Sequence, residues 1–473
     1  MKWITAVCGL AASLALAAPA HAGGPSMRIG AVEDAPRSTS LVQAKAQMTL
    51  ARLAGFDSIR VTEIWAPGET EPTADDVTAL SNVVTAADLS GMRVLVTVMP
   101  YGSKTTPLGA DLQTQFSQFA AAVVTKVPGI EDVIVGNEPN LNRYWLPQFN
   151  ADGSDAAAPA YESLLALTYD ALKAVSPTIT VYGGTVSPRG GDKPGTGRDT
   201  HSPTVFIKDL GAAYRASGRT TPIMDVYVQH VYEDNSSQPP ATAHPNSTSI
   251  SLADYDKLVA LLGTAFDGTA QPGSSLPILY GEFGVESQIP AARTALYSGT
   301  EPATTKPVDE ATQALYYSQA VQLAFCQPNV MGLMIFHVVD ELRLAGWQSG
   351  VYYANGKPKP SRDVVRTSAV ESRRGIVAHC AGLRLQVKAT VARIAATHFG
   401  VTCDIDCTYI ARLVRVGTGA TTATVRGRVT GGVPGGILFP TQRPGVYQIR
   451  VSLIAPVNPG PATAVTGQSF RLN

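Results

Sequence analysis

Charge, cysteine and long apolar runs are all scarce in this chain. Only 16% of its 473 residues are charged, and 37 Lys and Arg side chains balance 37 Asp and Glu. A net charge of zero offers no electrostatic attraction for nucleic acid or an anionic membrane, so we expect neither partner. The composition also excludes collagen, a coiled coil and a polytopic membrane protein. Apolar residues, 45% of the chain, suffice for a large core and exclude a disordered chain.

The one apolar run of note lies at the N-terminus and predicts an export signal. Lys2 supplies a positive charge, residues 6–18 are apolar, and a small-residue cleavage site follows at Ala20-His21-Ala22. We therefore expect residues 1–22 to be a signal peptide and the mature protein to be secreted, outside the cell or on the exterior of its envelope. An uncleaved membrane anchor is the alternative, but the run is shorter than the roughly 20 residues that a span needs.

The few cysteines predict disulfides. Cys8 leaves with the signal, and four cysteines remain, an even number in an exported chain. Three pairings are possible. We favour Cys403–Cys407, which are close in sequence, and Cys326–Cys380, which flank the last strand and helix expected below; four free thiols are the alternative. No Cys and His spacing is typical of a zinc site, so no metal is expected.

Residues 27–372 alternate β-rich runs with segments of helical period. We expect eight strands, at 27–32, 57–63, 93–99, 132–136, 178–182, 224–231, 278–283 and 331–338. We expect eight helices, at 41–53, 75–89, 112–127, 161–175, 205–216, 252–266, 310–325 and 361–370. This alternation predicts parallel strands with helical crossovers.

Eight such units predict an α/β fold that closes into a (β/α)₈ TIM barrel. The alternative is an open doubly wound sheet, which is weakened because no G-x-G-x-x-G turn follows the first strand. In a barrel, Cys326 and Cys380 would both lie at the bottom face, and Cα atoms more than ~7 Å apart would exclude their bridge.

Residues 378–473 lose the helical period. Alternating runs with Gly and Pro between them predict a small antiparallel β-sandwich, with strands within 383–391, 409–416, 422–429 and 447–454. None of the four tryptophans lies in this region. We therefore favour a spacer or stabilising role for this accessory domain over carbohydrate binding.

Two glutamates occupy the ends of predicted strands. The fourth strand leads into Gly136-Asn137-Glu138-Pro139-Asn140, and the seventh reads Tyr280-Gly281-Glu282-Phe283-Gly284. Barrel enzymes carry their chemistry at the C-terminal ends of the strands. Two carboxyl groups that face each other there can split a glycosidic bond, one as acid/base and one as nucleophile. A lone Asn-Glu-Pro is equally typical of a helix start, so the pairing with Glu282 matters.

These motifs resemble clan A of the glycoside hydrolases, retaining (β/α)₈ enzymes, and family five and its relatives most nearly. The resemblance covers residues 27 to about 370. It implies that Glu138 is the acid/base and Glu282 the nucleophile, that Arg60 in strand two lies near that nucleophile, and that Asn137 contacts the substrate 2-hydroxyl. Strand six carries the clan's His-x-Tyr as His230 and Tyr232.

The charges and hydrogen-bonding groups of these residues fit the same roles. Arg60 would hold Glu282 ionised by charge and hydrogen bonding, and Glu138, in a less cationic place, would keep its proton near neutral pH. His230 and Tyr232 lie two apart on a strand and share a face. Tyr232 would hydrogen-bond Glu282, and His230 a sugar hydroxyl.

The chain departs from the clan at two strand ends. The third strand ends at Tyr101 without the histidine often found there, and His337 near the end of strand eight stands where many relatives have tryptophan. We count Tyr101 and His337 among the substrate contacts, and Trp347 as the replacement sugar platform. Trp65 is a further candidate, although packing explains it equally well.

Several other side chains have less specific explanations. Glu286 is a rival nucleophile. Packing explains Trp145 and Tyr144 as well as sugar stacking does. Loop salt bridges or subsite contacts explain Glu63, Asp340 and Glu341 better than catalysis does, and solvation explains Arg189 and Lys193. Asn235 and Asn246 begin glycosylation sequons whose use the sequence does not decide.

The sequence thus predicts a secreted, monomeric, retaining glycosidase that acts on an oligosaccharide, polysaccharide or other glycoside without a cofactor. The alternatives are a catalytically silent barrel that binds glycans and a metal-dependent barrel hydrolase, whose clustered His-x-His ligands are missing. The sugar, the linkage and exo or endo action stay open.

Overall fold

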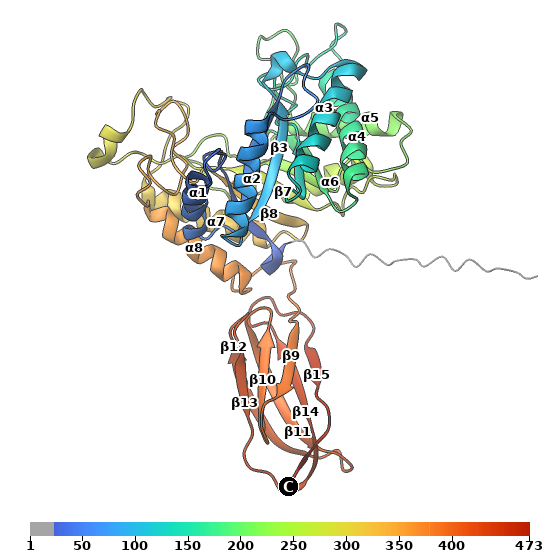
Figure 1. Cartoon of the computed structure of the whole chain (residues 1–473), viewed down its shortest axis with the longest axis vertical. Coiled ribbons are helices and arrows are strands. Elements are labelled where there is room, and N and C mark those ends of the chain that lie inside the picture. The colour runs from blue at the N-terminus through green and yellow to red at the C-terminus, as the bar shows by residue number, and fades with distance from the viewer. Residues whose placement is uncertain (1–22, 378) are drawn as a thin grey trace, which may run out of the picture.

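The computed structural model describes residues 23–377 and 379–473. The predicted signal peptide, residues 1–22, lies outside the described residues. Figure 1 shows two lobes, a rounded one built from helices around a barrel and an elongated one built from strands. The described part of the chain contains no helix long and apolar enough to cross a bilayer.

The barrel follows the predicted alternation. Its strands and helices in chain order are β1 (Arg28–Val32), α1 (Leu41–Leu53), β2 (Ser58–Trp65), α2 (Ala74–Asp88), β3 (Arg93–Pro100), α3 (Gly109–Lys126), β4 (Asp132–Val135), α4 (Ala157–Val175), β5 (Thr180–Val186), α5 (Pro203–Ala216), β6 (Val226–His230), α6 (Tyr255–Phe266), β7 (Ile278–Phe283), α7 (Glu310–Phe325), β8 (Val330–Phe336) and α8 (Pro360–Arg373). Short 3₁₀ turns lie at η1 (Gly24–Ser26), η2 (Ser103–Thr105) and η3 (Ala291–Leu296).

The eight strands form one closed parallel barrel in chain order, and β8 closes it against β1. The predicted TIM barrel is confirmed, and the open sheet is excluded. Inside the barrel the strands pack a small apolar cluster that includes Val32, Ile134, Tyr182 and Met334. A much larger core lies between the strands and the surrounding helices. The barrel is therefore a filled scaffold whose loops carry the chemistry.

Local sequence explains where the helices begin. The Ser40 side chain accepts a hydrogen bond from Gln43 N at the start of α1, and Thr73 and Asp76 form a reciprocal capping box at the start of α2. Strand β5 runs four residues past its predicted end because glycines interrupt the apolar pattern there. Gly184 has φ of 90°, and a Cβ at this position would lie 2.5 Å from a ring carbon of Tyr227.

The second lobe is the predicted β-sandwich. Its strands are β9 (Ala389–Arg393), β10 (His398–Cys403), β11 (Cys407–Arg415), β12 (Thr421–Val429), β13 (Gly435–Leu438), β14 (Gly445–Ile454), β15 (Thr463–Thr466) and β16 (Phe470–Leu472). One sheet has the order β13-β10-β9, and the other has β12-β11-β14-β15 with β16 beside β14. All pairings between these named strands are antiparallel.

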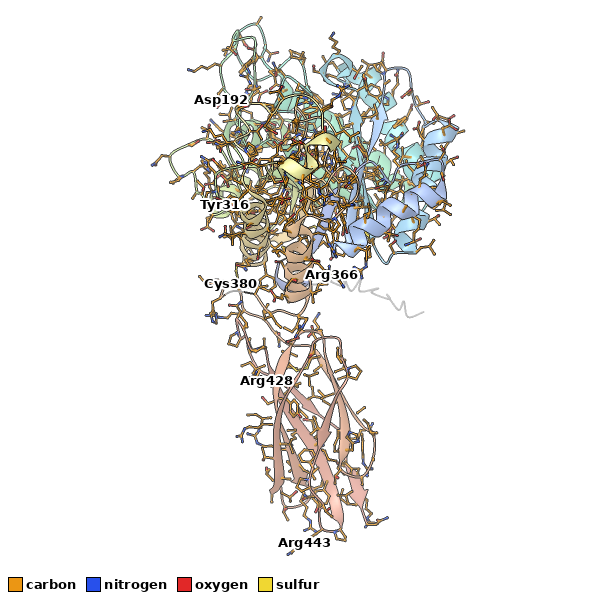
Figure 2. All side chains as sticks on the ribbon, turned by 90° about the vertical axis from the view of Figure 1, so that its left-hand side faces the viewer. Asp192, Tyr316, Arg366, Cys380, Arg428 and Arg443 are labelled. Atoms are coloured by element: carbon orange, nitrogen blue, oxygen red, sulfur yellow. A yellow bond between two sulfur atoms is a disulfide. The ribbon has the colours of Figure 1, made fainter. Side chains whose placement is uncertain are left out.

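Covalent and ionic contacts join the two lobes. Cys326 at the end of α7 is bonded to Cys380, with Cα atoms 5.1 Å apart, and Cys403 is bonded to Cys407. Both predicted disulfides are confirmed. Arg374 also donates twice to Asp406, at 3.0 and 2.8 Å. Figure 2 shows Cys380 at the junction between the lobes.

Candidate active site

The two predicted carboxylates meet at one end of the barrel. Glu282 lies in β7 next to its C-terminus, and Glu138 follows β4 by three residues. One carboxylate oxygen of each and a ring nitrogen of His230 all lie within 4.8 Å of one another. The side chains of Glu138 and Glu282 are 13% and 12% exposed. The pair is therefore enclosed but open to an incoming molecule.

A tight turn after β4 positions Glu138. Gly136 and Glu138 both have positive φ, 79° and 41°, and a Cβ on Gly136 would lie 3.1 Å from the Tyr161 ring. Glu138 N donates to Thr185 O at 2.9 Å, which ties this turn to the end of β5. No helix begins at Pro139, because the next helix starts at Ala157. The helix-start explanation of Asn-Glu-Pro is therefore wrong.

Arg60 and Tyr232 hold the Glu282 carboxylate. Arg60 Nη1 donates to Oε1 at 2.8 Å, and the Tyr232 hydroxyl donates to Oε2 at 3.0 Å. Burial by itself would raise the pKa of Glu282, but the neighbouring His230 and Arg60, together with the hydrogen bonds from Tyr232 and Arg60, lower it below its ordinary value. This environment keeps Glu282 ionised, as a nucleophile requires.

Other hydrogen bonds fix Arg60 itself. Its guanidinium donates from Nε to Thr97 Oγ1 at 2.7 Å, from Nη2 to Asn137 Oδ1 at 3.0 Å and from Nη1 to Gly281 O at 3.1 Å. The side chain is only 2% exposed. The sequence prediction missed Thr97, although a lone threonine in the apolar run of β3 is the kind of residue that such a buried donor requires.

His230 differs from its predicted role. Its Nδ1 lies 3.0 Å from Glu138 Oε1 and 3.5 Å from Glu282 Oε2, and the residue is 0% exposed. A fully buried ring cannot contact a sugar hydroxyl, so that prediction is wrong. Because Nδ1 faces carboxylate oxygens, this nitrogen donates to Glu138 and bridges the pair.

The same three ligand atoms are close enough to hold a metal ion. The Arg60 guanidinium, however, already occupies Glu282 Oε1. A fixed positive charge at 2.8 Å repels a second cation, so the arrangement suits acid–base chemistry better than metal binding.

An aromatic group adjoins Glu282. The Trp347 ring lies 5.0 Å from that of Tyr232 and 5.2 Å from that of Phe336, and Trp347 is half-buried. Tyr232 and Trp347 both line a cavity of about 410 Å³. This is the size range of a small-molecule site.

Three long loops wall this cavity, at 185–202, 233–249 and 287–307. They contribute Arg189 and Arg198, Glu233 to Ser236, and Pro302, Thr304 and Thr305. The loops also bind one another, since Ser236 N donates to Thr305 O at 3.0 Å. The three loops thus wall the cavity that adjoins Tyr232 and Trp347.

The rival nucleophile Glu286 also lines the cavity. It is 6% exposed, and its Oε2 accepts a hydrogen bond from Gln348 N at 3.3 Å. Burial raises its pKa to about 8. A carboxyl group that holds its proton at neutral pH is a poor nucleophile, which favours Glu282.

The remaining aromatic candidates lie in the core or on the surface. Trp65 is 0% exposed, packs 5.5 Å from Phe116 and donates to Glu69 O, so its prediction as a substrate contact is wrong. Trp145 is buried against Tyr161. Tyr101 is 73% exposed, and no described contact joins it to either carboxylate.

Tyr144 lies close enough to Glu138 for the charge of that carboxylate to affect its hydroxyl. Burial, with the charge of Glu138 next in importance, raises the pKa of its hydroxyl to about 12. The hydroxyl therefore stays protonated and can donate a hydrogen bond.

His337 is held at the rim of the barrel. Its Nδ1 lies 3.1 Å from Val32 O, and its Nε2 lies 3.4 Å from Glu341 Oε1. Burial alone would lower the pKa of His337, but Glu341 and Glu33 raise it above its ordinary value. A sugar contact by His337 stays a prediction.

Comparison with known proteins identifies the fold. No protein-family model and no curated protein matches the chain. Among solved structures, a family 39 glycoside hydrolase from Bacteroides cellulosilyticus WH2 is similar, with a TM-score of 0.52 and 15% identity over 88% of this chain and 82% of its own. A glucosidase from Croceicoccus marinus gives a TM-score of 0.50 and 10% identity over 88% of this chain and 94% of its own.

The chain has the fold of these glycoside hydrolases. A β-glucuronidase from Bacteroides uniformis, of which the chain spans 47%, reaches a TM-score of only 0.47 and 11% identity and adds no weight. The closer resemblance to family five stays a prediction.

Proposed function

We propose that the protein is a secreted retaining glycoside hydrolase with Glu282 as nucleophile and Glu138 as acid/base. The observation that carries this proposal is the approach of the two carboxylates, which have oxygens within 4.8 Å of each other at the C-terminal end of the barrel. Retaining enzymes hold their carboxyl groups ~5–5.5 Å apart, whereas inverting enzymes need ~6.5–9.5 Å to admit a water.

The first step breaks the glycosidic bond. An oxygen of Glu282 attacks the anomeric carbon while Glu138 gives its proton to the departing glycosidic oxygen, which leaves as an alcohol. The product is a glycosyl ester of Glu282 with inverted configuration. The Tyr232 and Arg60 hydrogen bonds keep Glu282 ionised and aimed before the attack.

The second step releases the sugar. Glu138, now ionised, takes a proton from water, and the resulting hydroxide attacks the anomeric carbon and frees Glu282. His230 Nδ1 donates to Glu138 and steadies its charge during this step. Asn137, with its Oδ1 bound by Arg60, presents its amide toward the substrate 2-hydroxyl. Neither step calls for a metal or an organic cofactor.

Export and a monomeric state belong to the same proposal. Two disulfides are typical of a protein that folds in an oxidising compartment. Trp347 beside the cavity supplies the sugar platform that the clan takes from a tryptophan after strand eight. A glycan-binding barrel without activity would have no need for both carboxylates and the buried Arg60.

Product stereochemistry tests the proposal. A panel of aryl glycosides identifies a substrate, and proton NMR during the first minutes of hydrolysis follows the anomeric signal of the released sugar. We expect the configuration of the substrate to be retained, and Glu282→Gln to lose turnover. Initial release of the opposite anomer, or hydrolysis by Glu282→Gln at the wild-type rate, would remove the mechanism.

A further inference from the structure

The neutral net charge conceals two oppositely charged lobes. Residues 23–377 hold 26 Lys and Arg against 35 Asp and Glu, whereas residues 379–473 hold ten Lys and Arg against only Asp404 and Asp406. Asp406 is already paired with Arg374. The sandwich is therefore strongly cationic, and such asymmetry between two parts of a chain is typical of a polyanion-binding module.

Four of these arginines share one sheet face. Arg426 and Arg428 lie two apart on β12, Arg412 lies on the neighbouring β11, and Arg450 lies on β14 directly opposite Arg412. We call these four side chains the cationic face. All four are exposed.

The cationic face has no internal counter-charge. Within the described residues, no ion pair and no side-chain hydrogen bond involves any of the four arginines, and Arg412 and Arg450 place like charges directly opposite each other. Such a pair destabilises a sheet. Solubility alone would be served by mixed charges, so the concentration of one sign points to a ligand.

A groove of about 550 Å³ lies on the same face. Its lining includes Arg426 and Arg428 together with the hydroxyl-bearing Thr408 and Ser452. The one aromatic in the lining, Tyr409, is 7% exposed and offers no stacking surface. Figure 2 shows Arg428 on the half of the sandwich nearer the barrel and Arg443 at the far tip.

We propose that the cationic face binds a linear polysaccharide that carries carboxylate or sulfate groups. A guanidinium group can donate two parallel hydrogen bonds to a pair of oxygens on a carboxylate or a sulfate, and strand spacing places the arginines about 5–8 Å apart along a diagonal of the sheet. Hydroxyls in the groove suit sugar hydroxyls. Single-stranded nucleic acid would need aromatic stacking, and a bilayer would need an apolar tip rather than a groove.

The choice of a polysaccharide rests in part on the proposed glycosidase function. The face would then hold an acidic glycan beside a barrel that cleaves glycosidic bonds. This replaces the spacer role predicted for the sandwich, which relied on the lack of tryptophan platforms. Recognition here is by charge rather than by stacking.

Two variants of the full chain test the proposal. The face variant and the control variant each replace three cations with glutamine, so both carry the same net charge. The face variant is Arg412→Gln, Arg426→Gln and Arg428→Gln. The control variant is Arg384→Gln, Lys388→Gln and Arg443→Gln, at exposed positions outside the face.

Calorimetric titration at fixed ionic strength measures binding to polygalacturonate, dextran sulfate, neutral dextran, duplex DNA and phosphatidylglycerol vesicles. We expect the wild-type chain to bind one or both acidic polysaccharides and not neutral dextran. Affinity for the acidic polysaccharide should fall about tenfold in the face variant and less than about threefold in the control variant. Equal losses in both variants, no binding to either acidic polysaccharide, or tighter binding to DNA or vesicles would overturn the proposal.

Hydrolysis of a small aryl glycoside separates this proposal from the proposed function. Both variants should keep the wild-type rate, because the cationic face lies outside the barrel. Lost polysaccharide binding with intact hydrolysis in the face variant supports the face. Polysaccharide binding in a chain that hydrolyses no glycoside would refute the glycosidase and leave the face intact.

Discussion

Removal of the Arg60 charge should change the pH dependence of activity. Arg60 donates to Glu282 Oε1 at 2.8 Å and is 2% exposed, so water screens this pair weakly. A cation this close lowers a carboxyl pKa by about one to three units. In Arg60→Met, Glu282 keeps its burial but loses this compensation, so its pKa should rise by about that amount.

The assay is the pH profile of kcat/KM on an aryl glycoside. Its acid limb reports ionisation of the nucleophile in the free enzyme, and activity falls as the pH drops through that pKa. Because the substitution raises the pKa of Glu282, the limb should move upward by about one to three pH units. Each unit corresponds to about 1.4 kcal/mol. The variant should also lose about 3–5 kcal/mol of stability, since it leaves a buried charge unpaired.

A matched control separates stability from ionisation. Arg93 pairs with Asp132 at the opposite end of the barrel, with Nη2 2.8 Å from Oδ1. Arg93→Met should lower stability without moving the acid limb, and Tyr232→Phe should move the limb less than Arg60→Met does because it removes one neutral donor. A folded Arg60→Met protein with an unchanged acid limb would refute the role of Arg60 as the compensating charge.

Three further predictions concern other groups. In steady-state kinetics, Glu138→Ala should lower kcat by about 10²–10⁴-fold on glycosides with poor leaving groups, and azide should partly restore activity. A loss of kcat that does not depend on the leaving group would contradict the role of Glu138 as an acid. Cys380→Ser removes the disulfide between cysteines 54 residues apart, and Cys407→Ser removes the one between cysteines four residues apart. In urea unfolding, the first should lower the free energy of unfolding by about 4 kcal/mol and the second by about 2 kcal/mol, because a longer loop restricts the unfolded chain more. Equal losses would show that loop length is not the cause. Glu286 has a pKa raised from 4.5 to about 8, so folding disfavours its ionisation and wild-type stability is lost as the pH rises through this range. Glu286→Gln should therefore gain stability relative to wild type between pH 5 and 8, on the order of a few kcal/mol, and a constant difference would contradict the raised pKa.

The strand order and the carboxylate pair were predictable because they depend on local periodicity. Eight alternations give a barrel, and a barrel brings the ends of β4 and β7 to one rim. The Arg60 contact with Glu282 came from the motif resemblance and is confirmed by distance. The pairing of β1 with β8, which closes the barrel, could be inferred only from the count of eight strands, since no residue near either strand predicts it.

Side-chain direction explains the errors. Side chains alternate between the two faces of a strand, so Trp65 lies on the same face of β2 as Val61 and on the opposite face from Arg60. Its buried ring therefore points to the helix layer and not to the barrel rim. His230 is on the expected face, but its neighbours Arg60 and the two carboxylates cover it completely. Strands β10 and β13 were missed because glycines such as Gly400 and Gly436 break the alternation that a strand pattern needs.

As the proposed nucleophile, Glu282 should form a covalent bond with the sugar. A 2-deoxy-2-fluoro glycoside of the preferred sugar with a good leaving group should trap that ester, and mass spectrometry of a proteolytic digest locates it. We expect one added glycosyl group per chain, on the peptide that contains Glu282, and none in Glu282→Gln. A label on Glu286 or Glu138 instead, or covalent labelling that persists in Glu282→Gln, would contradict this assignment.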